Sequence, residues 1–438
     1  GVDMDMQGAV YMENLAKSVA EGRVGEQSID IAVRRILEMK YRLGLFEDPY
    51  RYADEARQEA TLYKPEFLEA ARDVARKSMV LLKNEGDTLP IVAGAQSIAL
   101  IGPLADSKPD MIGSWAAAGD RQTRPVTVLE GLKARAGRGV RVEYAKGASY
   151  EFADAGKTDG FAEALAVANR SDVIVAVMGE KWDMTGEAAS RTSLDLPGNQ
   201  QALLERLVAT GKPVVLVMMS GRPNSITWAE ENVPAILHAW YPGTQGGHAV
   251  ADVLFGDYNP SGKLPVTFPV NVGQAPIYYD MKNTGRPIEL GAPGAKYVSR
   301  YLNTPNAPLY RFGYGLSYTD FAYSPVSLSA PSMGAGGSIT ASATITNTGK
   351  RAGAEIAQLY VRDLVGSVTR PVQELKGFEK VTLQPGESRT VTFTLRPEDL
   401  AFTRQDMSHG WEPGEFRLWI APSSGADAST PVTFTITE

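Results

Sequence analysis

The chain has 438 residues, which is enough for about three domains of ordinary size and a sizeable buried core. Hydrophobic residues make up 43% and charged residues 22% of the chain, as is typical of folded globular proteins, so disorder is excluded as the main state. The 44 basic and 51 acidic side chains leave a formal net charge of −7, so the chain lacks the basic field that gathers nucleic acid.

Cysteine is absent, and this excludes disulfides, thiolate nucleophiles and Cys-ligated metal centres. The histidines, His238, His248 and His409, lack the close helical spacing of a two-histidine metal site, so we expect no metal and no cofactor. The strongest apolar runs, residues 173–178 and 214–219, have the length of strands rather than of a membrane span. We therefore expect binding neither to a membrane nor to nucleic acid.

The first fifty or so residues are predicted to be helical, because apolar side chains recur at helical spacing from Met12 to Leu43, and Gly44 and Pro49 mark the exit. A charged stretch follows, and a strong helix pattern begins at Pro65 and runs through residue 82. Two helices without partners cannot bury a core, so the first segment is expected to be a remnant of a larger unit.

From residue 97 the pattern changes to short apolar runs that alternate with helical stretches. Strands are predicted at 97–102, 140–145, 172–179, 213–221 and 234–241, and helices at 161–170, 199–211 and 246–256. This order predicts a mostly parallel sheet flanked by helices. The turn after the first strand lacks the second and third glycines of a dinucleotide-binding motif, so a nicotinamide-binding fold is not supported.

Residues 256–318 are rich in Pro, Gly and Tyr and are expected to form a long connector. Beyond the connector, apolar and polar residues alternate between turn signals in 337–349, 354–363, 388–397, 414–422 and 431–437. Such short alternating segments predict a small all-β sandwich at the C-terminus.

The loop after the strand predicted at 172–179 is the first place to look for a site, because ligands of open α/β sheets bind at the carboxyl ends of strands. The charged and aromatic residues in this loop are Glu180, Asp183, Glu187, Arg191 and Asp195, with Trp182. Carboxylates beside an aromatic ring suit carbohydrate chemistry, and the alternative is a solvated polar loop in which Glu180 caps the strand end. No G-x-S-x-G motif occurs, which excludes a serine hydrolase of that type.

Several longer strings allow a family comparison, and they occur in order along almost the whole chain: ARKSMVLLKNEGDTLPI, IGPLADSKPDMIGSWAAAG, GEAASRTSLDLPG, TGKPVVLVMMSGRP, GDYNPSGKLPVTFP, PLYRFGYGLSYTDF, TNTGKRAG and ELKGFEKVTLQPGES. With them the chain resembles the bacterial periplasmic β-glucosidases of glycoside hydrolase family 3. A series of strings in one order is far more specific than a single motif.

The resemblance implies an α/β plus all-β fold. It comprises the remnant of a TIM-like barrel with a linker in residues 1–60, an α/β sandwich with a mostly parallel sheet and the connector in 61–318, and a fibronectin type III-like β-sandwich in 319–438. GVDMDMQ would be the last barrel strand. By the family's layout the nucleophile, an Asp, lies upstream of Gly1, so Asp3 and Asp5 are not expected to be catalytic.

The resemblance also implies a retaining, exo-acting β-glucosidase that hydrolyses terminal non-reducing β-D-glucosyl residues. In such enzymes one carboxylate attacks the sugar and a second carboxyl group protonates the departing oxygen. Glu187 matches the family's acid/base position, Glu180 is the second choice, and Arg191 is expected to orient the loop by pairing with a carboxylate. Ser114 and Trp115 resemble a loop near the glucosyl-binding subsite, and the alternative for them is a tight turn around a buried Trp.

Other functions stay open at this point. A β-xylosidase or an exo-β-glucanase would use the same chemistry. The sequence does not separate these activities from that of a β-glucosidase, because the resemblance implies that specificity depends on barrel residues. A non-catalytic carbohydrate-binding fragment is the third reading. The partners implied are β-linked gluco-oligosaccharides and the missing barrel segment, and a homodimer is allowed. The N-terminal residues lack the features of a signal peptide, yet the resemblance implies a periplasmic or secreted protein.

Overall fold

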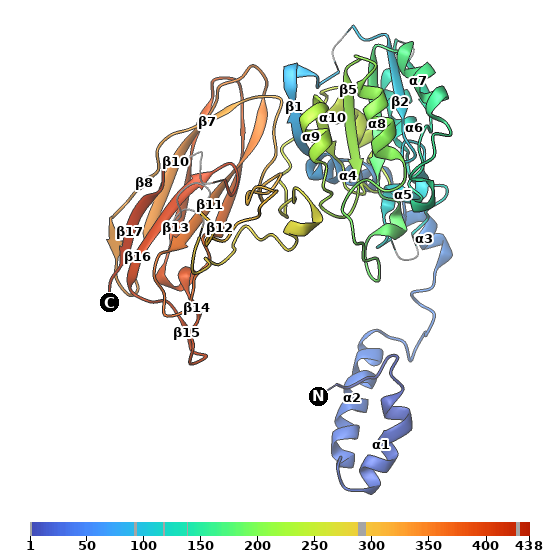
Figure 1. Ribbon diagram of the computed structural model, residues 1–438. Helices are drawn as coiled ribbons and strands as arrows, with labels where there is room; N and C mark the ends of the chain where they lie inside the picture. The colour runs from blue at the N-terminus through green and yellow to red at the C-terminus, as the bar shows by residue number, and fades with distance from the viewer. Residues whose placement is uncertain (1, 92–93, 117–118, 138, 288–294, 426–429) are drawn as a thin grey trace. The chain divides into compact units, whose positions relative to one another are not determined.

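The computed structural model describes residues 2–91, 94–116, 119–137, 139–287, 295–425 and 430–438. The chain divides into two compact units, Gly1–Phe67 and Leu68–Glu438. Figure 1 labels the helices and strands of both units.

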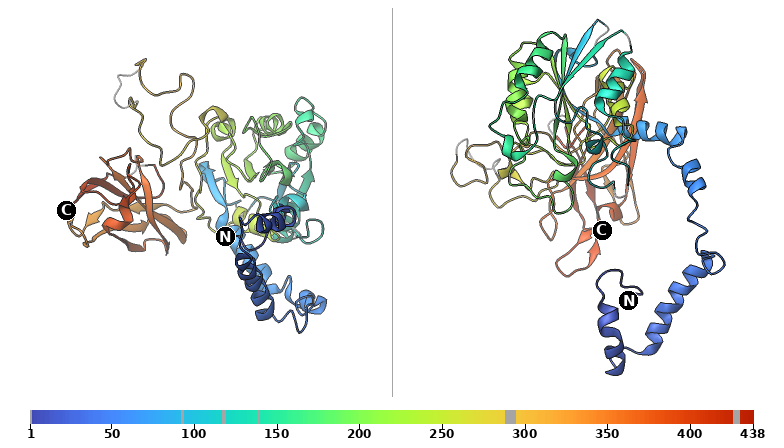
Figure 2. Two further views of the ribbon diagram at one scale, coloured as in Figure 1. Left: turned by 90° about the horizontal axis from the view of Figure 1, so that it is seen from below. Right: turned by 90° about the vertical axis from the view of Figure 1, so that its right-hand side faces the viewer.

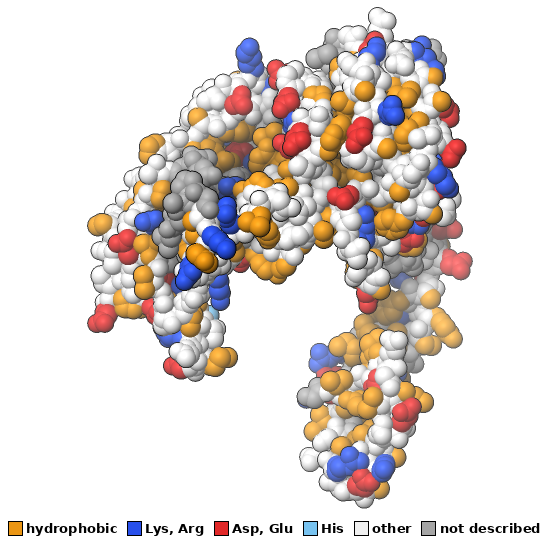
Figure 3. Space-filling model, viewed as in Figure 1, with side chains coloured by type: hydrophobic (Ala, Val, Ile, Leu, Met, Phe, Trp, Pro, Cys, Tyr) orange, Lys and Arg blue, Asp and Glu red, His pale blue; other side chains and the backbone are white. Residues whose placement is uncertain are grey.

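The first unit is helical, as the spacing of its apolar residues predicts. It contains α1 (Val10–Ala20), α2 (Glu26–Arg42) and α3 (Glu55–Thr61). The amphipathic faces of α1 and α2 have no larger core to cover, and no residue of these helices is buried. Apolar side chains such as Met12, Val33 and Met39 are therefore exposed. Figure 3 shows hydrophobic side chains on the surface of this unit.

The strand expected at the start of the chain does not form. Gly1 lies outside the described residues, and residues 2–9 contain no strand. A strand is stable only when a neighbour satisfies its backbone groups, and the described part of this unit offers helices alone. Asp5 instead caps the start of α1, where its carboxylate accepts hydrogen bonds from the backbone N–H groups of Gly8 at 2.8 Å and Val10 at 2.6 Å.

The second unit begins with α4 (Pro65–Ser78), most of which belongs to it, and continues with an α/β domain. The strands of this domain are β1 (Val80–Asn84), β2 (Ser97–Ile101), β3 (Arg141–Ala145), β4 (Val173–Gly179), β5 (Val214–Met219) and β6 (Ala235–His238). Its helices are α5 (Lys108–Ile112), α6 (Val128–Ala136), α7 (Phe161–Asn169), α8 (Gln200–Val208), α9 (Thr227–Asn232) and α10 (Gly246–Leu254). The sheet has the order β1-β6-β5-β4-β2-β3.

The strands from β3, at one edge of the sheet, to β6 are all parallel. Helices cover both faces of the sheet, as Figure 2 shows. Successive residues of a strand point to opposite faces of the sheet, so the side chains of each apolar run contribute to two hydrophobic cores. On β4, Ile174 and Ala176 pack in the core that includes α7 and α8. Val175 and Val177 pack in the core that includes α6 and α10. The predicted mostly parallel sheet is therefore confirmed.

One boundary was predicted wrongly. The helix pattern that begins at Pro65 ends at Ser78, and residues 80–84 form β1, which pairs antiparallel with β6. The reason is burial, since Met79 through Leu82 are all at most 1% exposed and so cannot lie on a helix with one solvated face.

The C-terminal part is a two-sheet sandwich. One sheet has the order β13-β10-β7, with β8 also paired to β10, and the other has the order β12-β11-β16-β17-β9. The strands are β7 (Phe321–Tyr323), β8 (Ser327–Leu328), β9 (Ser332–Met333), β10 (Ile339–Asn347), β11 (Gly353–Asp363), β12 (Glu374–Leu383), β13 (Ser388–Leu395), β16 (Gly414–Ala421) and β17 (Val432–Ile436), with a small hairpin of β14 (Phe402–Thr403) and β15 (His409–Gly410). Buried and partly exposed residues alternate along β10, so one side of the strand faces the core.

A buried ion pair joins the connector to the sandwich. Lys263 Nζ lies 3.2 Å from both carboxylate oxygens of Glu355 on β11, and the Tyr323 hydroxyl donates to the same carboxylate at 2.9 Å. No helix in the described part of the chain is long and apolar enough to cross a membrane.

Candidate active site

The order of the strands determines where a site can form. The chain runs from β2 to β3 on one side of β2 and then crosses to β4 on the other side, so β2 and β4 are neighbours at a topological switch point. Loops that leave the carboxyl ends of such a pair diverge and leave a crevice between them. The loop after β2 carries Ser114 and Trp115, and the loop after β4 carries Glu187.

The loop after β4 starts at Gly179, where the backbone has φ = 141°. A Cβ at this position would lie 1.9 Å from the carbonyl oxygen of Met219 on β5, so only glycine fits. The Gln200 side chain, at the start of α8, holds both backbone groups of Gly179: it accepts from the N–H at 2.9 Å and donates to the carbonyl at 2.8 Å. The base of the loop is therefore fixed to the sheet and to α8.

Glu180, the next residue, is fully buried and binds two arginines. One carboxylate oxygen, Oε1, pairs with Arg191 Nη1. The other, Oε2, accepts from Arg222 Nε at 3.0 Å and from Ser220 Oγ at 2.6 Å. The expected pairing of Arg191 with a carboxylate is thus confirmed, and Glu180 has neither a free oxygen nor the exposure that an acid/base would need toward a substrate.

The tip of the loop carries Glu187, which is exposed, between Gly186 at φ = 98° and Ala188 at φ = 57°. The tip approaches the other loop closely, because a Cβ on Gly186 would lie 2.6 Å from Ser114 Oγ and 3.3 Å from Trp115 Nε1. The structure therefore brings Gly186, the neighbour of Glu187 in the chain, close to Ser114 and Trp115. Trp115 is 75% exposed, so the alternative of a turn around a buried Trp is wrong.

Two further residues bind the backbone of the loop after β4. The Tyr241 hydroxyl, after β6, donates to the carbonyl oxygen of Glu180 or of Lys181, at 3.1 and 3.0 Å, and burial raises the pKa of this hydroxyl. Asp110 accepts the backbone N–H of Trp182 at 2.6 Å, and burial raises the pKa of its carboxyl, although the hydrogen bonds from Ser107 and from that N–H oppose the rise.

The ring of Trp182 is only partly exposed, although the sequence analysis suggested a role beside carboxylates in carbohydrate chemistry. The guanidinium of Arg121, from the loop after β2, lies 4.2 Å from the centroid of its indole ring, and Arg121 also donates to the carbonyl of Ser114 at 3.1 Å. This cation–π contact covers one face of the ring and ties the two loops to each other. The ring serves as a contact between the loops, which sequence analysis did not foresee.

Sequence reasoning also missed Arg222, Tyr241 and Gln200. Arg222 lies in SGRP, the end of one of the family strings, and Tyr241 is the last residue of the strand predicted at 234–241. Their position after β5 and β6, at the same carboxyl edge as the loop after β4, was the signal that could have identified them.

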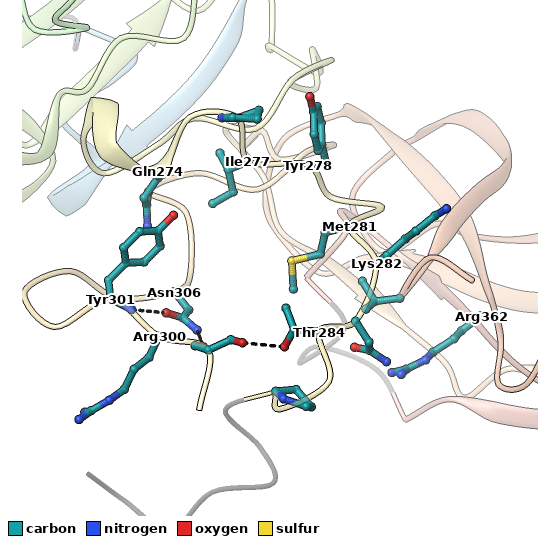
Figure 4. A pocket seen from close by; sticks show the side chains of 15 residues that line it. Gln274, Ile277, Tyr278, Met281, Lys282, Thr284, Arg300, Tyr301, Asn306 and Arg362 are labelled. Atoms are coloured by element: carbon teal, nitrogen blue, oxygen red, sulfur yellow. Dashed lines mark hydrogen bonds between the residues drawn. The ribbon is translucent and has the colours of Figure 1, made fainter. Parts of the chain in front are cut away.

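A cavity of about 810 Å³ lies elsewhere, between the connector and the sandwich (Figure 4). Residues of the connector, including Tyr278, Met281 and Tyr301, line it together with Arg362 and Val372. None of the 15 lining residues that the structure describes is Asp, Glu or His, so the cavity offers no group that transfers protons near neutral pH. The place where the loops after β2 and β4 meet is therefore the candidate active site.

Comparison with known proteins shows the family of the chain. Residues 79–318 match the Glycosyl hydrolase family 3 C-terminal domain, and residues 355–424 match the Fibronectin type III-like domain. The chain belongs to glycoside hydrolase family 3. A periplasmic beta-glucosidase of Salmonella typhimurium is 46% identical over 97% of this chain, and a beta-xylosidase of Formosa agariphila is 40% identical over 100%.

Solved structures of the family agree as well. A mutant beta-glucosidase from Listeria innocua in complex with laminaribiose matches 100% of this chain with a TM-score of 0.91 and 37% identity. The chain spans 58% of the length of the Salmonella relative, 60% of the Formosa relative and 59% of the Listeria chain. This family 3 chain thus has the fold of the Listeria structure over the part that the two share.

Proposed function

We propose that this chain supplies the acid/base loop of a retaining, exo-acting β-glucosidase that removes terminal non-reducing β-D-glucosyl residues from gluco-oligosaccharides. Glu187 is the acid/base, and Ser114 and Trp115 contact the terminal sugar. The observation that carries the proposal is the approach of the exposed Glu187 tip to Ser114 and Trp115 across the switch point. The similarity to beta-glucosidases supports the substrate class.

In the proposed reaction the nucleophile is an Asp upstream of Gly1, in a barrel segment that this chain does not include. Glu187 gives its proton to the glycosidic oxygen as the C–O bond breaks and the Asp forms an ester with the sugar. Glu187 then takes a proton from the water that hydrolyses this ester. The exposed apolar faces of α1 and α2 support a covering barrel, since such faces are normally buried in larger proteins.

The test is Glu187→Gln in a protein that also carries the segment preceding this alignment in the relatives. A general acid typically contributes 10²- to 10⁴-fold, so kcat/KM should fall by about that factor on laminaribiose, whose leaving group is a poor one. A dinitrophenyl β-glucoside needs no protonation and should keep its kcat/KM within about threefold. Azide should restore turnover and yield a β-glucosyl azide, which would identify the acid/base.

The matched control is Glu163→Gln, an exposed glutamate on α7, which should leave both rates unchanged. An equal loss of kcat/KM on both substrates in the Glu187→Gln protein would reject the acid/base role. Binding of sugar without hydrolysis by the wild-type protein would favour a non-catalytic carbohydrate-binding role.

A β-xylosidase is the second candidate, because the Formosa beta-xylosidase is 40% identical over the whole chain. The ratio of kcat/KM for aryl β-glucoside to that for aryl β-xyloside decides between the two. We also propose a periplasmic or secreted location, which the periplasmic Salmonella relative supports, and cell fractionation tests it. We also propose that the domains comprise residues 1–60, 61–318 and 319–438.

A further inference from the structure

We propose that Arg222, held by Glu180, is a positioning residue that fixes the loop carrying Glu187. This inference rests on the proposed function, because it assumes that Glu187 is the acid/base.

The contacts of Arg222 close the base of the loop. Its Nη2 donates to the carbonyl oxygens of Met184 and, at 2.8 Å, of Ala189. These two carbonyls lie on either side of the tip, residues 185–188, which contains Glu187. One nitrogen atom thereby holds both ends of the tip, and any opening of the tip would break at least one of these charge-assisted hydrogen bonds.

The charge of Glu180 holds Arg222 in place. Glu180 is fully buried, and its Oε2 binds Arg222 Nε at 3.0 Å. Its Oε1 binds Arg191, whose Nη2 donates to the carbonyl of Asp195 at 2.9 Å, farther along the same loop. A buried carboxylate needs paired cations, so the two arginines and Glu180 stabilise one another and fix both arms of the loop.

The conformation of the tip requires such support. Ala188 has φ = 57°, a left-handed conformation that is unfavourable for residues with a Cβ. Strained residues persist where the surrounding contacts determine the backbone, and they concentrate at functional sites. Arg222 binds the neighbouring carbonyl of Ala189, and Ser114 limits movement of Gly186 on the other side of Glu187. Without Arg222 the tip can relax, and Glu187 then leaves its place beside Ser114.

The experiment compares Arg222→Ala with the exposed Arg206→Ala on α8, in the protein that includes the preceding segment. Misplacement of a catalytic group by about 1 Å can cost on the order of 10²-fold, so Arg222→Ala should lower kcat/KM on laminaribiose by roughly 10- to 100-fold. Its kcat/KM on a dinitrophenyl β-glucoside, which reports only the step that releases the leaving group, should stay within about threefold. Guanidinium chloride at millimolar concentration should restore part of the lost rate, and Arg206→Ala should match the wild type.

A second measurement needs no activity and uses this chain alone. Arg191 is a trypsin site. Its side chain pairs with Glu180 and is only 8% exposed. Cleavage after Arg191 should become at least tenfold faster in Arg222→Ala and stay unchanged in Arg206→Ala. Unchanged cleavage, or an equal loss of kcat/KM on good and poor leaving groups, would overturn the inference.

The parallel Glu187→Gln measurement separates the two failures. If Glu187→Gln discriminates between the leaving groups and Arg222→Ala does not, the positioning role alone is wrong. If Glu187→Gln does not discriminate either, the proposed function is wrong, and the positioning role fails with it.

Discussion

His238, at the end of β6, offers a test of the structure that needs no substrate. Its ring is fully buried, 4.1 Å from the ring of Trp240 and 5.4 Å from that of Phe268. Its Nδ1 accepts the backbone N–H of Trp240 at 3.2 Å, so the neutral ring carries its proton on Nε2. Nε2 has no hydrogen-bond partner among the described residues. A second proton would bury a charge and remove the acceptor at Nδ1.

Burial lowers the pKa of His238 from 6.5 to about 3. Below pH 6.5 the His238 side chain of the unfolded chain therefore binds a proton, whereas that of the folded chain does not. The free energy of unfolding falls as the pH drops below 6.5. Each pK unit corresponds to about 1.4 kcal/mol, so lowering the pH from 7 to 5 should remove about 2 kcal/mol of the free energy of unfolding through this residue.

The assay is urea unfolding at both pH values, followed by tryptophan fluorescence, for the wild type, His238→Asn and His409→Asn. Asparagine keeps an acceptor near the position of Nδ1 and does not titrate, so His238→Asn should lose about 2 kcal/mol less than the wild type between pH 7 and pH 5. The loss of packing lowers its stability at both pH values alike and cancels in this difference. His409 is exposed, and its replacement should leave the wild-type difference unchanged. Equal losses in the wild type and in His238→Asn would refute the reasoning.

Two further predictions concern stability. Gly186→Ala places a Cβ 2.6 Å from Ser114 Oγ at φ = 98°, and should lower the free energy of unfolding by about 1–3 kcal/mol. Gly211→Ala is the control, since it has φ = 73° and no atom within 4 Å of the added Cβ, and an equal cost in urea unfolding of both variants would contradict the close approach of the two loops. Lys263→Met leaves Glu355 as an unpaired buried charge and should lower the free energy of unfolding by about 3–5 kcal/mol. Adding Glu355→Leu should recover most of this loss, as measured by thermal unfolding. No recovery would argue against the ion pair.

The hydrophobic pattern predicted most elements because burial imposes a period on the sequence. The alternation along residues 339–347 and the helical spacing along 26–42 each correspond to one observed element. β12 was missed as a strand because its burial pattern is irregular, with its first seven residues partly or fully exposed. The start of β1 was missed because a helix runs directly into it, and no turn residue separates the two.

The candidate site was predictable in its residue types and in part of its location. The sequence shows an acidic loop after an apolar strand, and general rules place a ligand there. It could not show which carboxylate is engaged, and Glu180 and Glu187 look alike in the sequence. Only their burial, complete for Glu180 and slight for Glu187, separates a residue that holds the loop from one that can meet a substrate.

The sequence by itself determined most of the elements, their order and the α/β and all-β halves, because these depend on local periodicity and on short-range turns. The tertiary structure alone decided which side chains meet. Glu180 and Arg222 follow different strands, 42 residues apart, and they pair because β4 and β5 lie side by side with their carboxyl ends at one edge. Such a contact depends on strand order, which no local pattern in the chain encodes.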